Sequence, residues 1–134
     1  MLDIGMTHEM SWRVEPQHLA SAFGSGLVDV LATPVLVGFC EEASRMMVEP
    51  GLDPGQKTVG THVSLDHLAA TPLGMMVRVQ ARLAEIDRRR LHFEIEAYDD
   101  VELVGRATHD RFIVDAERFE AGIADKLARA DSAP

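Results

Sequence analysis

The spacing of hydrophobic residues changes once along the chain, near residue 55. Before that point, residues 32–48 are apolar on nearly every face of a helix, with one stripe formed by Leu36, Cys40, Ala43 and Met47. A helix with so little polar surface is normally buried, usually against a sheet. The pattern therefore predicts one long helix at the centre of the fold.

Both ends of this helix are marked in the sequence. Thr33 is a good N-cap residue, and Pro34 then falls at the first helical position, where a proline is favoured. The Glu-Pro-Gly sequence at residues 49–51 cannot continue the helix. We expect the helix to end at Val48.

After residue 55, apolar and polar residues alternate with the period of two that is typical of half-buried strands. The predicted strands span residues 58–68, 75–87, 91–98 and 101–114. The breaks between them are of hairpin length, which favours an antiparallel sheet. The remaining predicted elements are a short strand at 7–14, a helical turn within 16–23 and a terminal helix at 115–130.

One helix cannot cover both faces of such a sheet, and both faces carry some apolar residues. The economical solution is an α+β fold in which an antiparallel sheet wraps around its own helix and pairs with a second copy. With 134 residues and 46% hydrophobic residues, the chain can form one domain with a real core. We therefore expect a single domain over 1–134, with residues 115–134 as a C-terminal helix and tail.

The formal net charge of −9 argues against a nucleic-acid partner, because a phosphate backbone would be repelled. A run of apolar residues long enough to cross a membrane is lacking, and the N-terminus does not resemble a signal peptide. The only cysteine, Cys40, lies in the predicted buried helix and cannot form an internal disulfide. These features predict a cytoplasmic protein without a membrane or nucleic-acid partner.

Two acids interrupt the central helix, and their surroundings differ. Glu42 shares a helical stripe with polar residues, whereas Glu41 shares its stripe with Val37, Ser44 and Val48. A carboxylate on a dry stripe costs several kcal/mol unless it is paired. We therefore expect Glu41 to be buried and to have a partner elsewhere in the chain.

A partner is available on the first of the four strands. Strict alternation places His67 on one face with Val59, Thr61, Val63 and Leu65, and that face is apolar enough to contact the helix. A structural hydrogen bond within the core is the other interpretation of this histidine.

Thr33 lies eight positions before Glu41, which is about two helical turns or about 12 Å of rise. A histidine from the sheet could lie between the two, and a hydroxyl, an imidazole and a carboxylate are the groups that activate an oxygen nucleophile. Thr33 has the alternative role of a simple N-cap. Gly60 and the helix N-terminus could polarise a carbonyl oxygen, although Gly60 equally suits a bulge or close packing.

Competing motifs are lacking: the sequence has no glycine-rich phosphate loop, no histidine pair at metal-ligand spacing and no nucleophile elbow. The scattered histidines, among them His92 and His109, are interpreted as structural or exposed. His109 and Arg111 alternate onto the same face as Gly105 and Ala107, whose small side chains leave room for the helix or a substrate.

Taken together, these segments resemble the hotdog-fold thioesterases of the fluoroacetyl-CoA thioesterase type. The resemblance covers about residues 28–118, and its most specific part is the segment 67–74. The matching motifs are Ala32-Thr33-Pro34, Gly38-Phe39-Cys40-Glu41, Val59-Gly60-Thr61, His67-Leu68-Ala69-Ala70-Thr71-Pro72-Leu73-Gly74 and Thr108-His109-Asp110-Arg111.

The resemblance implies a dimeric protein with the hotdog fold. It also implies an enzyme that hydrolyses a small acyl-CoA at a cleft in the dimer interface, with no metal or organic cofactor. The family's catalytic residues correspond to Thr33, Glu41 and His67. The glycine whose amide binds the thioester carbonyl corresponds to Gly60, and the arginine that lines the acyl end of the substrate site corresponds to Arg111. His67 is then the general base, oriented by Glu41, toward Thr33 or a water. Pairing of dimers into a dimer of dimers is left open.

Two departures from the fluoroacetyl-specific member leave the acyl group open. Pro34 follows the threonine where that member has glycine, and the short segment before the helix carries only Phe23, where that member has a longer insert. Two other functions also stay open at this point. One is a non-catalytic acyl-CoA-binding hotdog module, and the other is a hotdog hydratase or dehydratase.

Overall fold

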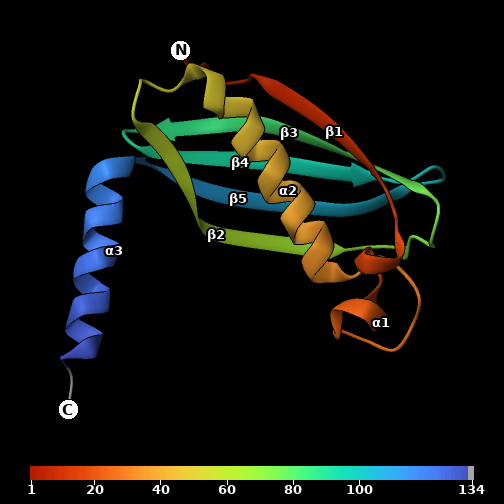
Figure 1. The fold of residues 1–134 in the computed structure, drawn as a ribbon. Coiled ribbons are helices and arrows are strands. Elements are labelled where there is room, and N and C mark those ends of the chain that lie inside the picture. Colours follow the sequence, from red (N-terminus) through yellow and green to blue (C-terminus); the bar gives the residue numbers. More distant parts are fainter. Residues whose placement is uncertain (133–134) are drawn as a thin grey trace.

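The computed structural model describes residues 1–132, and its elements follow the predicted order (Figure 1). The strands are β1 (Thr7–Arg13), β2 (Gln56–His67), β3 (Met76–Asp87), β4 (Arg90–Tyr98) and β5 (Leu103–Asp115). The helices are α1 (Ala20–Phe23), α2 (Thr33–Val48) and α3 (Ala116–Asp131), with short 3-10 turns at Pro16–His18 and Glu49–Gly51. Of the predicted C-terminal tail, residues 133 and 134 lie outside the described residues.

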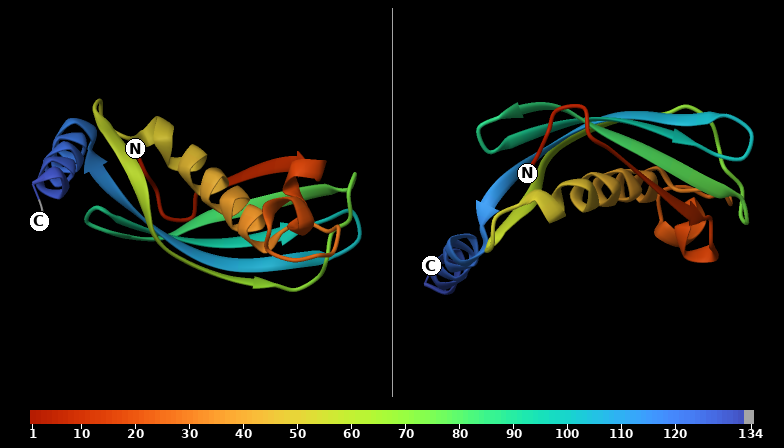
Figure 2. Two further views of the ribbon diagram at one scale, coloured as in Figure 1. Left: turned by 60° about the horizontal axis from the view of Figure 1, so that its bottom comes forward. Right: turned by 90° about the horizontal axis from the view of Figure 1, so that it is seen from above.

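The five strands form one antiparallel sheet in the order β1-β3-β4-β5-β2. Figure 2 shows the sheet curving over α2, which lies across its concave face. The predicted apolar rows of β3 and β4 face this helix and are buried: Val77, Val79, Ala81 and Leu83, and Leu91, Phe93, Ile95 and Ala97. The predicted α+β hotdog architecture is thus confirmed.

The packing of α2 explains why its sequence is so apolar. Leu36, Cys40, Ala43 and Met47, the stripe identified from the sequence, are each at most 5% exposed. Phe39 stacks on Trp12 of β1 with ring centroids 4.2 Å apart. Burial of this many large side chains, at about 1.5–3 kcal/mol each, holds the helix against the sheet.

The start of α2 differs from the prediction by one residue. The N-cap is Ala32, so Thr33 is already helical and Pro34 is in the first turn. No side chain caps this helix, and the Thr33 hydroxyl is therefore available for another partner. The prediction that Thr33 is the N-cap was wrong.

Strand β2 contains an irregularity that strict alternation missed. Gly60 pairs with Arg111 and His62 pairs with Asp110, so Thr61 is an extra residue in the ladder. The inner face before this bulge carries Gly60 and Thr58, and not Val59 and Thr61 as predicted. Such bulges reorient side chains near functional sites.

Helix α3 leaves the end of β5 and projects away from the sheet (Figure 2). It contributes no buried side chain, and Phe119, Ile123 and Leu127 along it are 41–64% exposed. None of the helices in residues 1–132 has the length and hydropathy needed to cross a membrane.

Candidate active site

The first turn of α2 meets the last residue of β2 at a hydrogen bond between two candidate residues. Thr33 Oγ1 lies 2.8 Å from Nδ1 of His67, although the two residues are 34 positions apart. The threonine is exposed and the histidine is half-buried, so the pair lies at the surface end of the helix. The structure therefore brings together two of the three predicted catalytic groups.

The surroundings of His67 favour a neutral imidazole. Burial lowers the pKa of His67 from its ordinary value, and the carbonyl of Ala69 opposes this only in part. The other ring nitrogen, Nε2, is buried with no hydrogen-bond partner among the described residues. A neutral imidazole whose Nδ1 is in hydrogen-bond contact with a hydroxyl can take a proton from that hydroxyl or from a water nearby.

Glu41 lies two turns further along α2, in a different group of residues. Its side chain is 43% exposed in the protomer, so the prediction that it is buried was wrong for the single chain. Its charged partner is Arg111, whose Nη1 lies 3.9 Å from Oε2. Among residues 1–132, no hydrogen bond or ion pair joins Glu41 to His67.

Gly60 stands against this carboxylate because the β2 bulge turns it inward. A Cβ atom at this position would lie 3.2 Å from Glu41 Oε2 and 3.3 Å from His109 Cε1. Any larger residue would push the carboxylate or the imidazole aside. The two roles foreseen for this glycine, a bulge and a close approach, therefore occur together.

Arg111 is 5% exposed and rigidly held. Its Nε donates to Thr58 Oγ1 at 2.8 Å and its Nη2 donates to the Thr58 carbonyl at 3.0 Å. Burial lowers the pKa of Arg111, while Glu41 counteracts this, and an arginine stays charged in either case. The side chain is a fixed cation that lies beside both Glu41 and Gly60.

His109 is the site residue that sequence reasoning missed. Its Nδ1 donates to the His62 carbonyl at 2.7 Å, which leaves Nε2 to accept from Arg111 Nη1 at 3.2 Å. The residue is 1% exposed, and burial lowers its pKa, so it stays neutral and keeps this tautomer. The alternation that placed His109 and Arg111 on one face was the available signal.

A metal-binding group is not found in the described part of the chain: no three His, Cys, Asp or Glu side chains are gathered in positions that could hold an ion. The chemistry that the geometry offers is therefore that of a hydroxyl, an imidazole, a carboxylate and backbone amides. Such groups serve acyl transfer, in which a nucleophile attacks a carbonyl carbon and an oxyanion is stabilised.

Comparison with solved structures defines the class of protein. The thioesterase-superfamily protein TTHA0967 from Thermus thermophilus superposes with a TM-score of 0.92 and 28% identity, covering 98% of this chain and 97% of its own. The fluoroacetyl-CoA thioesterase FlK superposes with a TM-score of 0.89 and 30% identity, covering 94% and 98%. The fold is that of the hotdog thioesterases.

The sequence gives the family. The profile of the fluoroacetyl-CoA-specific thioesterases matches residues 14–117. The fluoroacetyl-CoA thioesterase of Streptantibioticus cattleyicolor is 38% identical over 98 residues, which are 73% of this chain and 70% of that protein. The chain belongs to the family of fluoroacetyl-CoA-specific thioesterases, and it is a thioester hydrolase.

Proposed function

We propose that the protein hydrolyses a small acyl-CoA thioester, with Thr33, His67 and Glu41 as catalytic residues and Gly60 and Arg111 as substrate-binding residues. The observation that carries this proposal is the hydrogen bond between Thr33 Oγ1 and His67 Nδ1 at the start of α2. A hydroxyl already paired with a neutral imidazole is prepared for proton transfer. The membership of a thioesterase family gives that chemistry its substrate class.

The complete site requires a second subunit. Within one protomer, Thr33 contacts His67 and Glu41 lies beside Gly60, and the two groups are about 12 Å apart along α2. Strand β2 lies at the edge of the sheet, so its outer backbone groups are free to pair with another strand.

Antiparallel pairing of two β2 strands joins the two groups. We place the two-fold axis midway between Gly60 and His67, so that each His67 would lie opposite the partner's Gly60. Seven positions separate these residues, so regular alternation would leave them on opposite faces, and the extra residue Thr61 brings both to the inner face. The carboxylate of the partner's Glu41 then comes toward the imidazole.

The reaction follows from these positions. His67 takes the proton of water or of the Thr33 hydroxyl, whose oxygen attacks the thioester carbonyl. The amide of the partner's Gly60 and the N-terminus of α2 stabilise the oxyanion. When the C–S bond breaks, the imidazolium returns its proton to the CoA thiolate, and the partner's Glu41 stabilises the imidazolium in between. If Thr33 is the nucleophile, a water that His67 deprotonates then hydrolyses the acyl-threonine ester, and the proton returns to the Thr33 oxygen. The mechanism uses no metal and no organic cofactor, and the free thiol of Cys40 suits a cytoplasmic enzyme.

The acyl group is small, and fluoroacetyl-CoA is a candidate because it is the named substrate of the relatives. The test is thiol release from a panel of acetyl-, fluoroacetyl-, propionyl- and butyryl-CoA, followed with a disulfide reagent. We expect turnover of at least one member, and a loss of on the order of 10²–10⁴-fold in the His67→Ala variant.

His92→Ala is the matched control, because His92 lies on the outer face of the sheet against Asp110. The His92→Ala enzyme should keep the parent rate. Saturable binding of every acyl-CoA without thiol release would make the protein a binding module instead. A folded His67→Ala protein with the parent rate would remove the proposed mechanism.

A further inference from the structure

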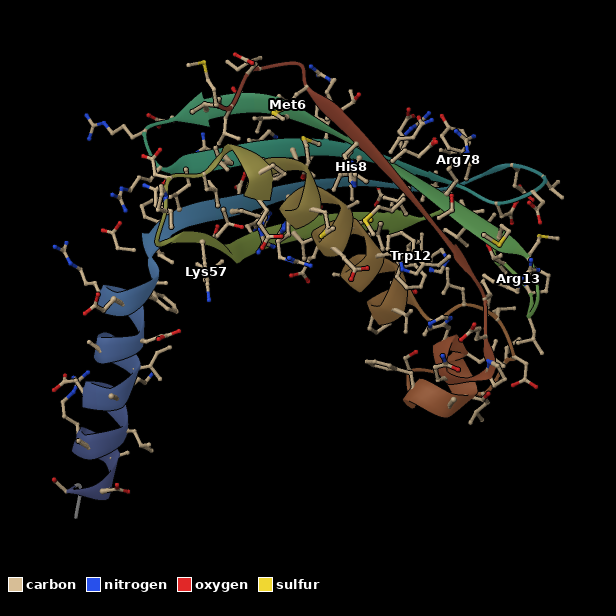
Figure 3. The ribbon with its side chains drawn as sticks, turned by 45° about the horizontal axis from the view of Figure 1, so that its top comes forward. Met6, His8, Trp12, Arg13, Lys57 and Arg78 are labelled. Carbon is tan, nitrogen blue, oxygen red and sulfur yellow. The ribbon has the colours of Figure 1, made fainter. Side chains whose placement is uncertain are left out.

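The cations of this acidic chain are unevenly distributed. Most arginines form ion pairs with acids: Arg45, Arg78, Arg82, Arg89, Arg90, Arg106, Arg111 and Arg129. Within residues 1–132 five cations have no acidic partner, and all but Arg13 lie at the α3 end of the sheet: Lys57, Arg88, Arg118 and Lys126. Figure 3 shows Lys57 on the side of α3, with Arg13 and Arg78 at the opposite end.

An open cleft of about 420 Å³ lies between α3 and the end of β5. Two of these cations, Arg118 and Lys126, line it, together with the ion pair of Arg89 and Asp115. Its apolar surface includes Phe112, Phe119 and Ile123, which are 42%, 41% and 55% exposed. Arg118 and Lys126 line it from α3, at positions eight residues apart on one helical face. The cleft therefore combines an apolar floor with a positively charged rim.

We propose that this cleft, which we name the α3 cleft, binds the nucleotide end of the CoA substrate. This rests on the proposed function, because CoA carries an adenine ring, a diphosphate and a 3′-phosphate. A chain with a formal net charge of −9 repels such an anion unless local cations hold it. Arg118 and Lys126 bind the phosphates, and the adenine packs on Phe112 and Phe119.

The distance to the reacting groups suits this ligand. The cleft lining on β5 runs from Phe112 to Asp115, and Asp115 lies four positions after Arg111, which corresponds to about 13 Å. The pantetheine arm of CoA is about as long as four to five extended residues. A thioester held near Gly60 and Arg111 can therefore place its nucleotide in the α3 cleft of the same subunit.

The test is the double variant Arg118→Glu/Lys126→Glu, assayed on an acyl-CoA and on the matching acyl-pantetheine, which has no nucleotide. We expect KM for the acyl-CoA to rise at least tenfold, with kcat and the kinetics of acyl-pantetheine unchanged. The control is Arg106→Glu/Arg129→Glu, which makes the same change in net charge at two exposed arginines outside the cleft. Its KM for the acyl-CoA should stay within twofold of the parent value.

Binding of CoA itself, measured by calorimetry, separates the two proposals. If the parent protein hydrolyses neither substrate, the proposed function is wrong. The Kd for CoA then still tests whether the α3 cleft binds the nucleotide. A Kd for CoA at least tenfold weaker in the cleft variant supports the subsite. Equal affinity in both variants, or equal losses on acyl-CoA and acyl-pantetheine, overturns it. A change in oligomeric state with unchanged KM also overturns it, since the cleft is then a contact between copies.

Discussion

Two places on α2, the first turn with Thr33 and the turn with Glu41, differ in their surroundings. At its first turn, Thr33 and His67 are in direct contact at 2.8 Å, and one atom of the imidazole is buried. Two turns later, Glu41 is nearly half exposed, and its Oε2 lies 3.9 Å from the arginine that faces it. The first group is ready for proton transfer within one protomer, while the second is open to solvent.

This difference is the one expected if the site is divided between two subunits, as we propose. A carboxylate that oriented the imidazole of its own chain would have to cross about two turns of helix. The same carboxylate lies directly beside Gly60, which the proposed edge pairing of β2 would place opposite the partner's His67. In the proposed dimer, the partner subunit would cover the Glu41 group, which is open in the single chain.

Of the changes that test this difference, Glu41→Gln is expected to have the largest effect on catalysis. The amide keeps the shape of the side chain but cannot stabilise the imidazolium, so kcat should fall on the order of 10²-fold. Steady-state hydrolysis of the preferred acyl-CoA measures it. Glu42→Gln, on the neighbouring position of the helix, is the control and should keep the parent kcat. Parent activity in Glu41→Gln would show that the second group takes no part in catalysis.

A smaller effect is expected from Gly60→Ala. The added Cβ meets Glu41 Oε2 at 3.2 Å, so the carboxylate must shift by a few tenths of an ångström. A shift of that size should lower kcat/KM about tenfold, since catalysis is sensitive to sub-ångström placement. Gly38→Ala is the matched control: its Cβ meets nothing within 4 Å, and removing a helical glycine should stabilise the protein by up to about 1 kcal/mol. Similar kcat/KM values for the two variants would contradict the importance of the close approach between Gly60 and the Glu41 carboxylate.

The smallest effect is expected from His109→Phe, which removes a hydrogen-bond partner of Arg111 and changes how the stability of the fold depends on pH. Burial lowers the pKa of His109, so the unfolded chain binds its proton more readily. The stability that His109 contributes is present above about pH 6.5 and is lost as pH falls further. Melting temperatures between pH 7.5 and 5.5 should therefore decline less in His109→Phe than in the parent.

The His109→Phe variant should also lose about 1–3 kcal/mol at pH 7.5, because the His62 carbonyl and Arg111 Nη1 are left without this partner. Chemical denaturation at pH 7.5 measures that loss. If the melting temperature falls equally with pH in the parent and the variant, the pKa of His109 does not differ between the folded and unfolded states, and the prediction is wrong.

Much of the fold could be predicted because its signals are local. The apolar stripe of α2 and the alternating rows of β3 and β4 point to the core without any knowledge of the fold. The N-cap at Ala32 was missed because Thr33 is the better capping residue by type, and its hydroxyl bonds His67 instead. That choice depends on a strand more than thirty residues away.

The site was harder to predict because it depends on a bulge. An extra residue at Thr61 leaves no clear mark in the sequence, yet it reverses the faces of Val59 and Gly60. The exposure of Glu41 could not be predicted either, since a dry helical stripe is equally consistent with burial by a sheet or by a second subunit. The residues next to Glu41 in the sequence do not distinguish these two possibilities.

The central claim is that each active site combines Thr33 and His67 of one subunit with Glu41 of the other. The direct measurement is the activity of a heterodimer of His67→Ala and Glu41→Gln chains, purified through two different affinity tags. One of its two sites then carries both defects and the other is intact, so we predict about half of the parent activity per dimer. Both mutant homodimers should be on the order of 10²-fold lower than the parent. A heterodimer as inactive as the two homodimers would contradict the shared site.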